Sequence, residues 1–286
     1  QGSWFTYHRG FGFGGGLALN STDSAGYTFA SPITAASDTT VTINNPANNG
    51  NVNASGESYV AYLFAHNDGD AEFGPTYDQD IIKCGSFTTD GSGLATVDLG
   101  WEPQWIMYKR TDGTGNWFIR DVMRGWSRST NNFLRADLSD AEVATTGDYT
   151  SPTPTGFQIG PTAGAAGNNQ AHIYIAIRRG TKVPESGTEV FEPTTRGGSA
   201  PRFSTGFPVD LHIRTNRNGG SNIVYDRFGI QLLTDSTAAG SSAPAGYFAS
   251  NEGVDMSSGG VETNEMSWNW KRAPNFCDFV AYTGNG

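Results

Sequence analysis

Gly115-Asn116-Trp117-Phe118-Ile119-Arg120-Asp121-Val122-Met123-Arg124-Gly125 is the stretch that decides the fold, because the chain contains related versions of it. The related versions are Gly2-Ser3-Trp4-Phe5-Thr6-Tyr7-His8-Arg9-Gly10 and the more divergent Gly220-Ser221-Asn222-Ile223-Val224-Tyr225-Asp226-Arg227-Phe228-Gly229. Trp117 follows Trp4 by 113 residues (117 − 4), and its counterpart Asn222 comes 105 residues later (222 − 117). An array of similar units favours a surface-building or binding molecule over a protein with a single active site.

A short apolar or aromatic run follows each copy, starting 44 to 56 residues after the Trp or Asn. The three runs are Tyr59–His66, Ile173–Gly180 and Met266–Arg272. Each is too short to show a helical period, which predicts a strand buried on both faces. We expect the apolar strands near residues 59–65, 105–108 and 173–177 to form the cores.

Strand-like runs separated by Gly, Pro, Ser, Thr and Asn predict an all-β chain with many turns. We expect tandem β-sandwich units of a lectin-like or jelly-roll-like kind, with long polar loops and at most short helical turns. One such turn is expected at Ser139-Asp140-Ala141-Glu142, which has the pattern of a capping box.

The repeat divides the chain into five parts. They are 1–68, the C-terminal part of a first unit; 69–84, a linker or inter-repeat strand; 85–180, a complete second unit; 181–272, a divergent third unit; and 273–286, the start of a further unit. This division predicts that the chain is a piece of a longer polypeptide or is trimmed at both ends.

Composition narrows the classes of partner. The formal net charge is −10, so the chain lacks the positive field that draws general nucleic-acid binders to phosphate. No apolar run has the length of a membrane span, and we expect no membrane insertion. Cys84 and Cys277 do not occupy equivalent repeat positions, which predicts two free thiols.

Motifs for catalysis are missing from the sequence, and we expect no enzyme activity. The four histidines are not spaced as metal ligands, and Gly10–Gly16 is interpreted as a packing loop or hairpin. Paired carboxylates for glycoside hydrolysis stay an open alternative, since sequence does not show their separation. The best candidates for an ion site are the oxygens of Asp68, Asp70, Asp78 and Asp80, which suit calcium but lack EF-hand spacing.

Aromatic residues are the remaining candidates for binding. The Trp residues inside strand runs are expected in the core. Trp126 lies between Arg124-Gly125 and Ser127-Arg128 in a polar stretch, so the sequence predicts a surface contact there.

Several phrases together resemble a known family. They are Gly85-Ser86-Phe87-Thr88, Gly100-Trp101-Glu102-Pro103-Gln104-Trp105, Gly115-Asn116-Trp117-Phe118, Tyr174-Ile175-Ala176-Ile177-Arg178-Arg179-Gly180 and Tyr282-Thr283-Gly284-Asn285-Gly286. Sequences like these occur in tandem in virion structural proteins of tailed phages, especially marine ones, often of the tail-fibre or tail-appendage type. The resemblance implies lectin-like β-sandwich units and brings no catalytic or ligand residues with it.

The leading functional hypothesis is a non-enzymatic structural component of a phage virion: a tail fibre, tail appendage or capsid-surface fibre. Its expected partners are other copies of itself, other virion proteins and a host-surface glycan, and its expected location is the virion surface or extracellular space. A secreted carbohydrate-binding or adhesin module is the alternative, followed by a polysaccharide depolymerase.

Overall fold

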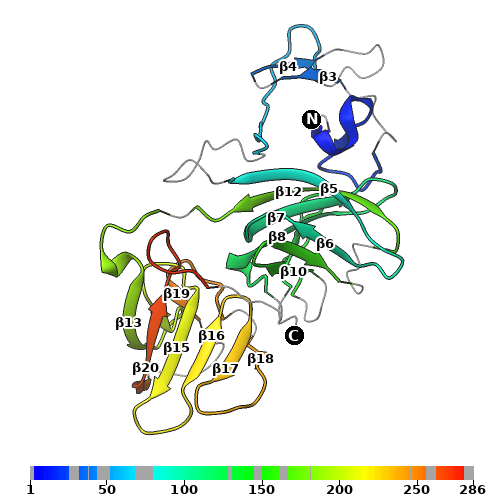
Figure 1. Ribbon diagram of the computed structural model, residues 1–286. Coiled ribbons are helices and arrows are strands. Elements are labelled where there is room, and N and C mark those ends of the chain that lie inside the picture. The colour runs from blue at the N-terminus through cyan, green and yellow to red at the C-terminus, as the bar shows by residue number, and fades with distance from the viewer. Residues whose placement is uncertain are drawn as a thin grey trace.

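The computed structural model describes residues 3–25, 32–37, 39–43, 52–67, 80–127, 131–144, 150–160, 167–180, 182–244, 247–255 and 262–279. All paired strands in this part of the chain are antiparallel. Among these described residues, helical structure is confined to three short 3-10 elements, and the expected all-β, sandwich-type fold is confirmed. Figure 1 shows two sheet systems below a small N-terminal hairpin.

The second unit is a sandwich of two sheets. Its larger sheet has the order β5 (Ile82–Thr88), β12 (Ala171–Arg178), β7 (Pro103–Arg110), β8 (Trp117–Asp121) and β9 (Leu134–Arg135). The smaller sheet has the order β10 (Thr150–Thr153), β11 (Gly156–Ile159) and β6 (Ala95–Asp98).

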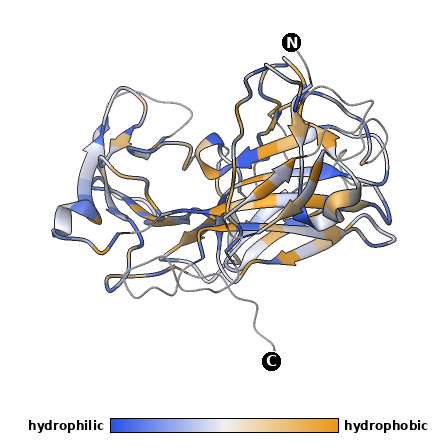
Figure 2. Cartoon of the chain, turned by 90° about the horizontal axis from the view of Figure 1, so that it is seen from above, coloured by the Kyte–Doolittle hydropathy of each residue, from blue (hydrophilic) through white to orange (hydrophobic). Residues whose placement is uncertain are grey.

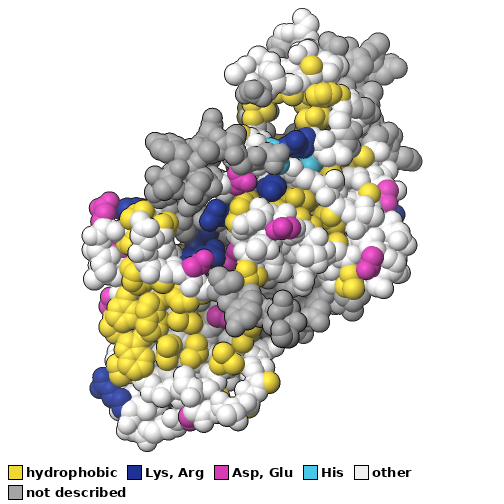
Figure 3. All heavy atoms as spheres, viewed as in Figure 1, with side chains coloured by type: hydrophobic (Ala, Val, Ile, Leu, Met, Phe, Trp, Pro, Cys, Tyr) yellow, Lys and Arg dark blue, Asp and Glu magenta, His cyan; other side chains and the backbone are white. Residues whose placement is uncertain are grey.

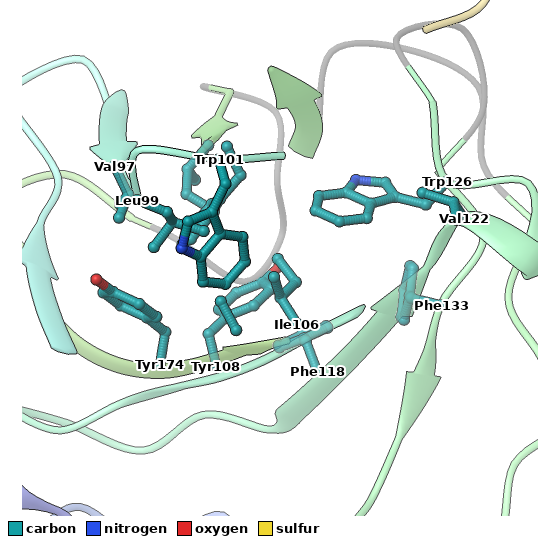
Figure 4. Packing of buried hydrophobic residues seen from close by; sticks show 13 residues of the cluster. Val97, Leu99, Trp101, Ile106, Tyr108, Phe118, Val122, Trp126, Phe133 and Tyr174 are labelled. Carbon is teal, nitrogen blue, oxygen red and sulfur yellow. The ribbon is translucent and has the colours of Figure 1, made fainter. Parts of the chain in front are cut away.

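Alternation along the strands sends one set of side chains into this sandwich and the other set away from it. Tyr108, Phe118 and Tyr174 point inward and join the main hydrophobic cluster, which also contains Trp101 and Phe157 (Figure 4). The β7 and β12 runs predicted to form cores, at 105–108 and 173–177, lie in this sheet.

The third unit repeats the strand order of the second. Its sheet has the order β13 (Phe191–Arg196), β20 (Glu262–Trp270), β15 (Leu211–Asn216), β16 (Ile223–Asp226) and β17 (Ile230–Leu233), with β18 (Ser241–Ser242) added at the end. Two short strands, β14 (Phe203–Ser204) and β19 (Gly253–Val254), correspond to β6 and β11. Seen from above, hydrophobic segments gather on the strands of both sheet systems (Figure 2).

One backbone hydrogen bond recurs in all three copies of the opening motif. The carbonyl oxygens of Trp4, Trp117 and Asn222 accept from the next strand at N···O distances of 2.8, 3.1 and 3.0 Å. The donors are Leu19, Ala136 and Thr234. Asn222 therefore occupies the backbone position of the Trp residues, although its side chain is different.

The N-terminal residues form a cover for the outer face of the second unit. The cover contains β1 (Phe5–Thr6), the 3-10 turn η1 (Arg9–Gly14) and β2 (Leu17–Ala18), whereas β3 (Ile33–Ala36) and β4 (Val41–Ile43) form a largely exposed hairpin that stands away from the sheet (Figure 1). Leu17 packs with Trp117 and Ile173 in a separate hydrophobic cluster. Most of the glycine stretch, predicted as a packing loop or hairpin, is the 3-10 turn η1, and Gly16 after it packs closely, since a Cβ there would lie 2.2 Å from the ring of Phe5.

Two polar contacts fix this cover. The indole Nε1 of Trp117 donates to the carbonyl oxygen of Ala18 at 2.9 Å, and the Nζ of Lys109 donates to that of Thr22 at 3.0 Å. Lys109 is fully buried, and burial lowers its pKa to about 8. The bonds satisfy both polar groups, so the cover belongs to the folded structure of this face.

The prediction that residues 59–65 form a core was wrong. This stretch is not a strand, and Val60, Tyr62, Leu63 and Phe64 are 58–80% exposed. The equivalent strand β12 is buried because β5 and β7 pair with both of its edges. No strand of the described chain pairs with residues 59–65. Without neighbouring strands the apolar side chains of this run are not covered and stay exposed to solvent.

The predicted helical turn at the capping box was also wrong. Glu142 binds Arg124 at 2.9 Å instead of turning back to cap a helix. Val143 exchanges two backbone hydrogen bonds with Phe133, at 3.0 and 3.1 Å, which holds the stretch extended. The 3-10 turns after the N-terminal one are η2 (Val122–Arg124) and η3 (Gly187–Glu189).

Pro193 lies on the edge strand β13. The position equivalent to Pro193 in the second unit, judged from the strand registers, is Cys84 on β5. The backbone N–H of Cys84 points away from β12 and donates to the Nδ1 of His66 at 3.0 Å. Proline has no N–H to donate and is tolerated in sheets at such edge positions. The outer edge of β13 therefore lacks one backbone donor.

Candidate functional site

Trp126 is buried, which corrects the prediction that it makes a surface contact. Its side chain is 1% exposed and belongs to the main cluster of the second unit (Figure 4). The indole Nε1 donates to the carbonyl oxygen of Thr150 at 2.8 Å. The polar residues beside it in sequence misled the prediction, because the apolar surroundings of Trp126 come from strands distant in sequence.

Only one of the four predicted calcium ligands lies within the described residues. Asp68, Asp70 and Asp78 lie outside the described residues, and Asp80 lies just before β5. Among the residues that the structure describes, no group of three or more His, Cys, Asp or Glu side chains is placed to hold a metal ion. Calcium at these aspartates stays a prediction. In the same part of the chain, no helix has the length and apolar character needed to cross a membrane.

His212 is a packing residue of the third unit. His212 is fully buried in the third unit, against the rings of Phe203 and Tyr247. Its Nδ1 lies 2.7 Å from the Oδ1 of Asn269, whose Nδ2 already donates to the carbonyl oxygen of Glu192 at 2.8 Å. The proton therefore resides on Nδ1, and burial lowers the pKa of His212 to about 4.

This buried histidine predicts a pH-dependent stability. Between pH 6.5 and 4, His212 is protonated in the unfolded chain but not in the folded chain. The free energy of unfolding therefore decreases as the pH is lowered through this window. The expected loss from this group is about 3 kcal/mol. His212→Gln keeps a donor for Asn269, and chemical unfolding of this variant is expected to show a smaller decrease over that window. Equal decreases in both proteins would contradict the assignment.

Charged side chains meet at the junction of the second and third units. Glu102 binds Arg227 and also Arg272, the latter at 2.7 Å. Asp210 binds Arg179, and its Oδ1 lies 3.2 Å from the Nη1 of Arg227. Both carboxylates are almost completely buried. These three guanidinium groups and two buried carboxylates form the junction cluster, and Asp278 lies at its rim with Oδ1 3.9 Å from the Nη1 of Arg272.

The junction cluster is reciprocal. Ile175 and Trp268 occupy equivalent positions in the registers of β12 and β20, and Arg179 and Arg272 each come four residues later (179 − 175 and 272 − 268). Arg179 reaches an acid of the third unit, and Arg272 reaches an acid of the second. The sequence signal for this pairing was the basic pair after each central run, Arg178-Arg179 and Lys271-Arg272.

The junction cluster holds the units together and leaves no room for a substrate. Both carboxylates are engaged by guanidinium groups, so neither is available as a general acid or nucleophile. A cavity of about 20 Å³ lies beside Arg179 and Arg227, which is room for a single water molecule.

A broad apolar surface lies on the outer side of the third-unit sheet, on the face seen in Figure 3. The central row crosses five strands in register: Pro193, Trp268, Ile213, Val224 and Leu232. A neighbouring row consists of Phe191, Trp270 and Leu211, and Met266 follows on the other side. We call these nine residues the outer apolar face. Leu232 is 46% exposed, and Phe191 packs on Trp270 with ring centroids 5.1 Å apart.

Comparison with known proteins gives one family and no characterised relative. The family described as Domain of unknown function (DUF7483) matches residues 1–179, so the match ends next to the last residue of β12, Arg178. No curated protein and no solved structure matches the chain. Since the matched residues make up well over half of the 286, the chain belongs to the DUF7483 family.

Proposed function

We propose that the chain is a non-enzymatic structural component of a phage virion, located in a tail fibre, tail appendage or capsid-surface fibre. The observation that carries the proposal is the repeated architecture: two units share one strand order and are joined through a buried ion cluster. Units of this kind add their stabilities along an array, which suits a molecule whose task is to extend and to present surface.

Two further observations support this role. Four of the five phrases that resemble tandem repeats of tailed-phage virion proteins coincide with β5, the start of β7, the start of β8 and the end of β12, and the fifth, Tyr282–Gly286, lies outside the described residues. The buried histidine and the junction carboxylates are occupied by structural contacts, so these titratable groups stabilise the fold. Adhesion to a host-surface glycan is a further role that we assign to the assembled fibre.

The proposal is tested by locating the chain in particles. Antibodies raised against the purified chain are expected to label a defined site on intact phage particles in electron microscopy, and cryo-electron microscopy is expected to show copies in a symmetric appendage or surface layer. Preimmune serum provides the control. Particles without label, together with calcium-dependent binding of the purified chain on a glycan array, would instead favour a secreted carbohydrate-binding module.

Depolymerase activity is tested separately. Host surface polysaccharide is incubated with the purified chain, and the reducing ends released over time are counted against a heat-denatured sample. The proposed function predicts no release above that control. Sustained release would replace the structural role by an enzymatic one.

A further inference from the structure

The outer apolar face is the counterpart of a surface that the same chain buries elsewhere. In the second unit, Met107 pairs with Ile175 and Ile119; in the third, Ile213 pairs with Trp268 and Val224 in the same arrangement. The N-terminal cover lies on the second-unit face, where Leu17 contacts Trp117 and Met107 packs against the cluster. Among the described residues, no segment covers the third-unit face in the same way, and it is visible in Figure 3.

The third-unit face is not shaped to receive a second N-terminal cover. The two polar anchors of that cover are Trp117 and Lys109. The registers place Asn222 and Thr215 at these positions, and neither side chain reproduces an indole N–H or an ammonium group. A partner of the outer apolar face would therefore be held by apolar contact and not by these two polar anchors.

We propose that the outer apolar face binds the same face of a second copy of this chain. Two sheets pack face to face about 10 Å apart with their side chains interdigitated, and an isologous dimer is the commonest way to bury a self-complementary surface. The proposal deepens the assembly role under the proposed function, and self-association at this face can be measured without any phage particle.

Charge and polarity favour an apolar partner over a glycan. The charged residue in these rows is Asp226, which pairs with Leu211 at the end of the neighbouring row. The Oδ1 of Asp226 already accepts a hydrogen bond from the backbone N–H of Ile230 at 3.0 Å. The hydroxyls of Thr195 and Thr215 lie at one end, so the central row offers no side-chain hydrogen bond to a sugar. A flat surface of aliphatic and aromatic groups matches a second surface of the same composition.

The size of the face sets the expected affinity. Five strands spaced about 4.8 Å apart and three rows about 7 Å apart span about 300 to 400 Å² of sheet in each copy. A standard stable complex buries about 800 Å² per partner, so we expect a weak, concentration-dependent dimer. The chain carries a net charge of −10, so salt should screen the repulsion between copies and strengthen the association.

Analytical ultracentrifugation of the whole chain tests the proposal over about 1 to 500 µM protein, in low and high salt. The expected result is a monomer–dimer equilibrium that stops at the dimer and strengthens with salt. Leu232→Lys is expected to weaken dimerisation about tenfold or more, because it places a charge in the dry contact. Leu232 is 46% exposed in the monomer, so this variant should fold normally, which circular dichroism checks.

Leu94→Lys is the matched control, because Leu94 is 43% exposed and lies outside the outer apolar face. A monomer at every concentration, an unaltered dimer in Leu232→Lys, or equal weakening in Leu94→Lys would overturn the proposal. Growth beyond the dimer would overturn the isologous arrangement. Binding of a soluble polysaccharide by a monomer, lost in Leu232→Lys, would assign the face to a glycan. None of these results depends on whether antibodies label a particle.

Discussion

Replacing Trp126 by alanine is expected to destabilise the second unit by about 3 to 5 kcal/mol. The indole is 1% exposed, so its removal leaves a large cavity in the main cluster and deprives the Thr150 carbonyl of its donor. Unfolding in denaturant, followed by near-ultraviolet circular dichroism, measures the loss. Binding and assembly are expected to change only as far as the unit unfolds.

Trp4→Ala is the control for this prediction. Trp4 is 49% exposed and stacks on Tyr62 at a ring-centroid distance of 6.3 Å, so its loss is expected to cost less than about 1 kcal/mol. If Trp126→Ala unfolds like the wild-type chain, or loses a ligand while keeping full stability, the indole is not the structural element that its burial indicates.

Replacing Asp210 by asparagine is expected to cost about 3 to 5 kcal/mol, because buried guanidinium groups lose a compensating carboxylate. Arg179 and Arg227 both bind Asp210, and the backbone N–H of Arg272 donates to its Oδ2 at 2.6 Å. We expect the second and third units to separate in thermal unfolding, with a transition that is single in the wild-type chain becoming two.

Two variants sharpen the test of the junction. Arg179→Gln combined with Asp210→Asn should recover part of the loss, since the double variant removes a buried charge together with its partner. Asp140→Asn breaks a surface pair in which Asp140 is 53% exposed, and it should change the unfolding free energy by less than about 1 kcal/mol. Equal effects of Asp210→Asn and Asp140→Asn would show that the junction is open to solvent.

The sequence predicted the recurring units better than it predicted the surfaces, and the shared strand order of the units comes from the structure alone. The opening motif and the apolar run that follows it depend on local alternation, and the structure places their counterparts in the second and third units at matching registers. Asn222 shows that the spacing of the motif predicted the structure better than the identity of each residue did. Asn222 differs from Trp117 in its side chain but makes the same backbone hydrogen bond.

The failures share a physical cause, which is that burial depends on residues distant in sequence. Trp126 has polar neighbours along the chain, yet its partner Thr150 lies 24 residues away. Residues 59–65 have the composition of a central strand but no strands beside them among the described residues. The junction cluster joins Arg227 to Glu102 over 125 residues, and no local pattern specifies that contact.

The proline at the edge of β13 has a consequence for how copies of the chain meet. An open sheet edge is a template for runaway polymerisation into amyloid-like ribbons, in which each new chain adds a strand through its backbone. Pro193 interrupts the row of backbone donors that such addition requires, and its ring obstructs an approaching strand. Growth through the edge is thereby suppressed, so contact between copies is directed to side-chain surfaces, which stop at a defined number of molecules.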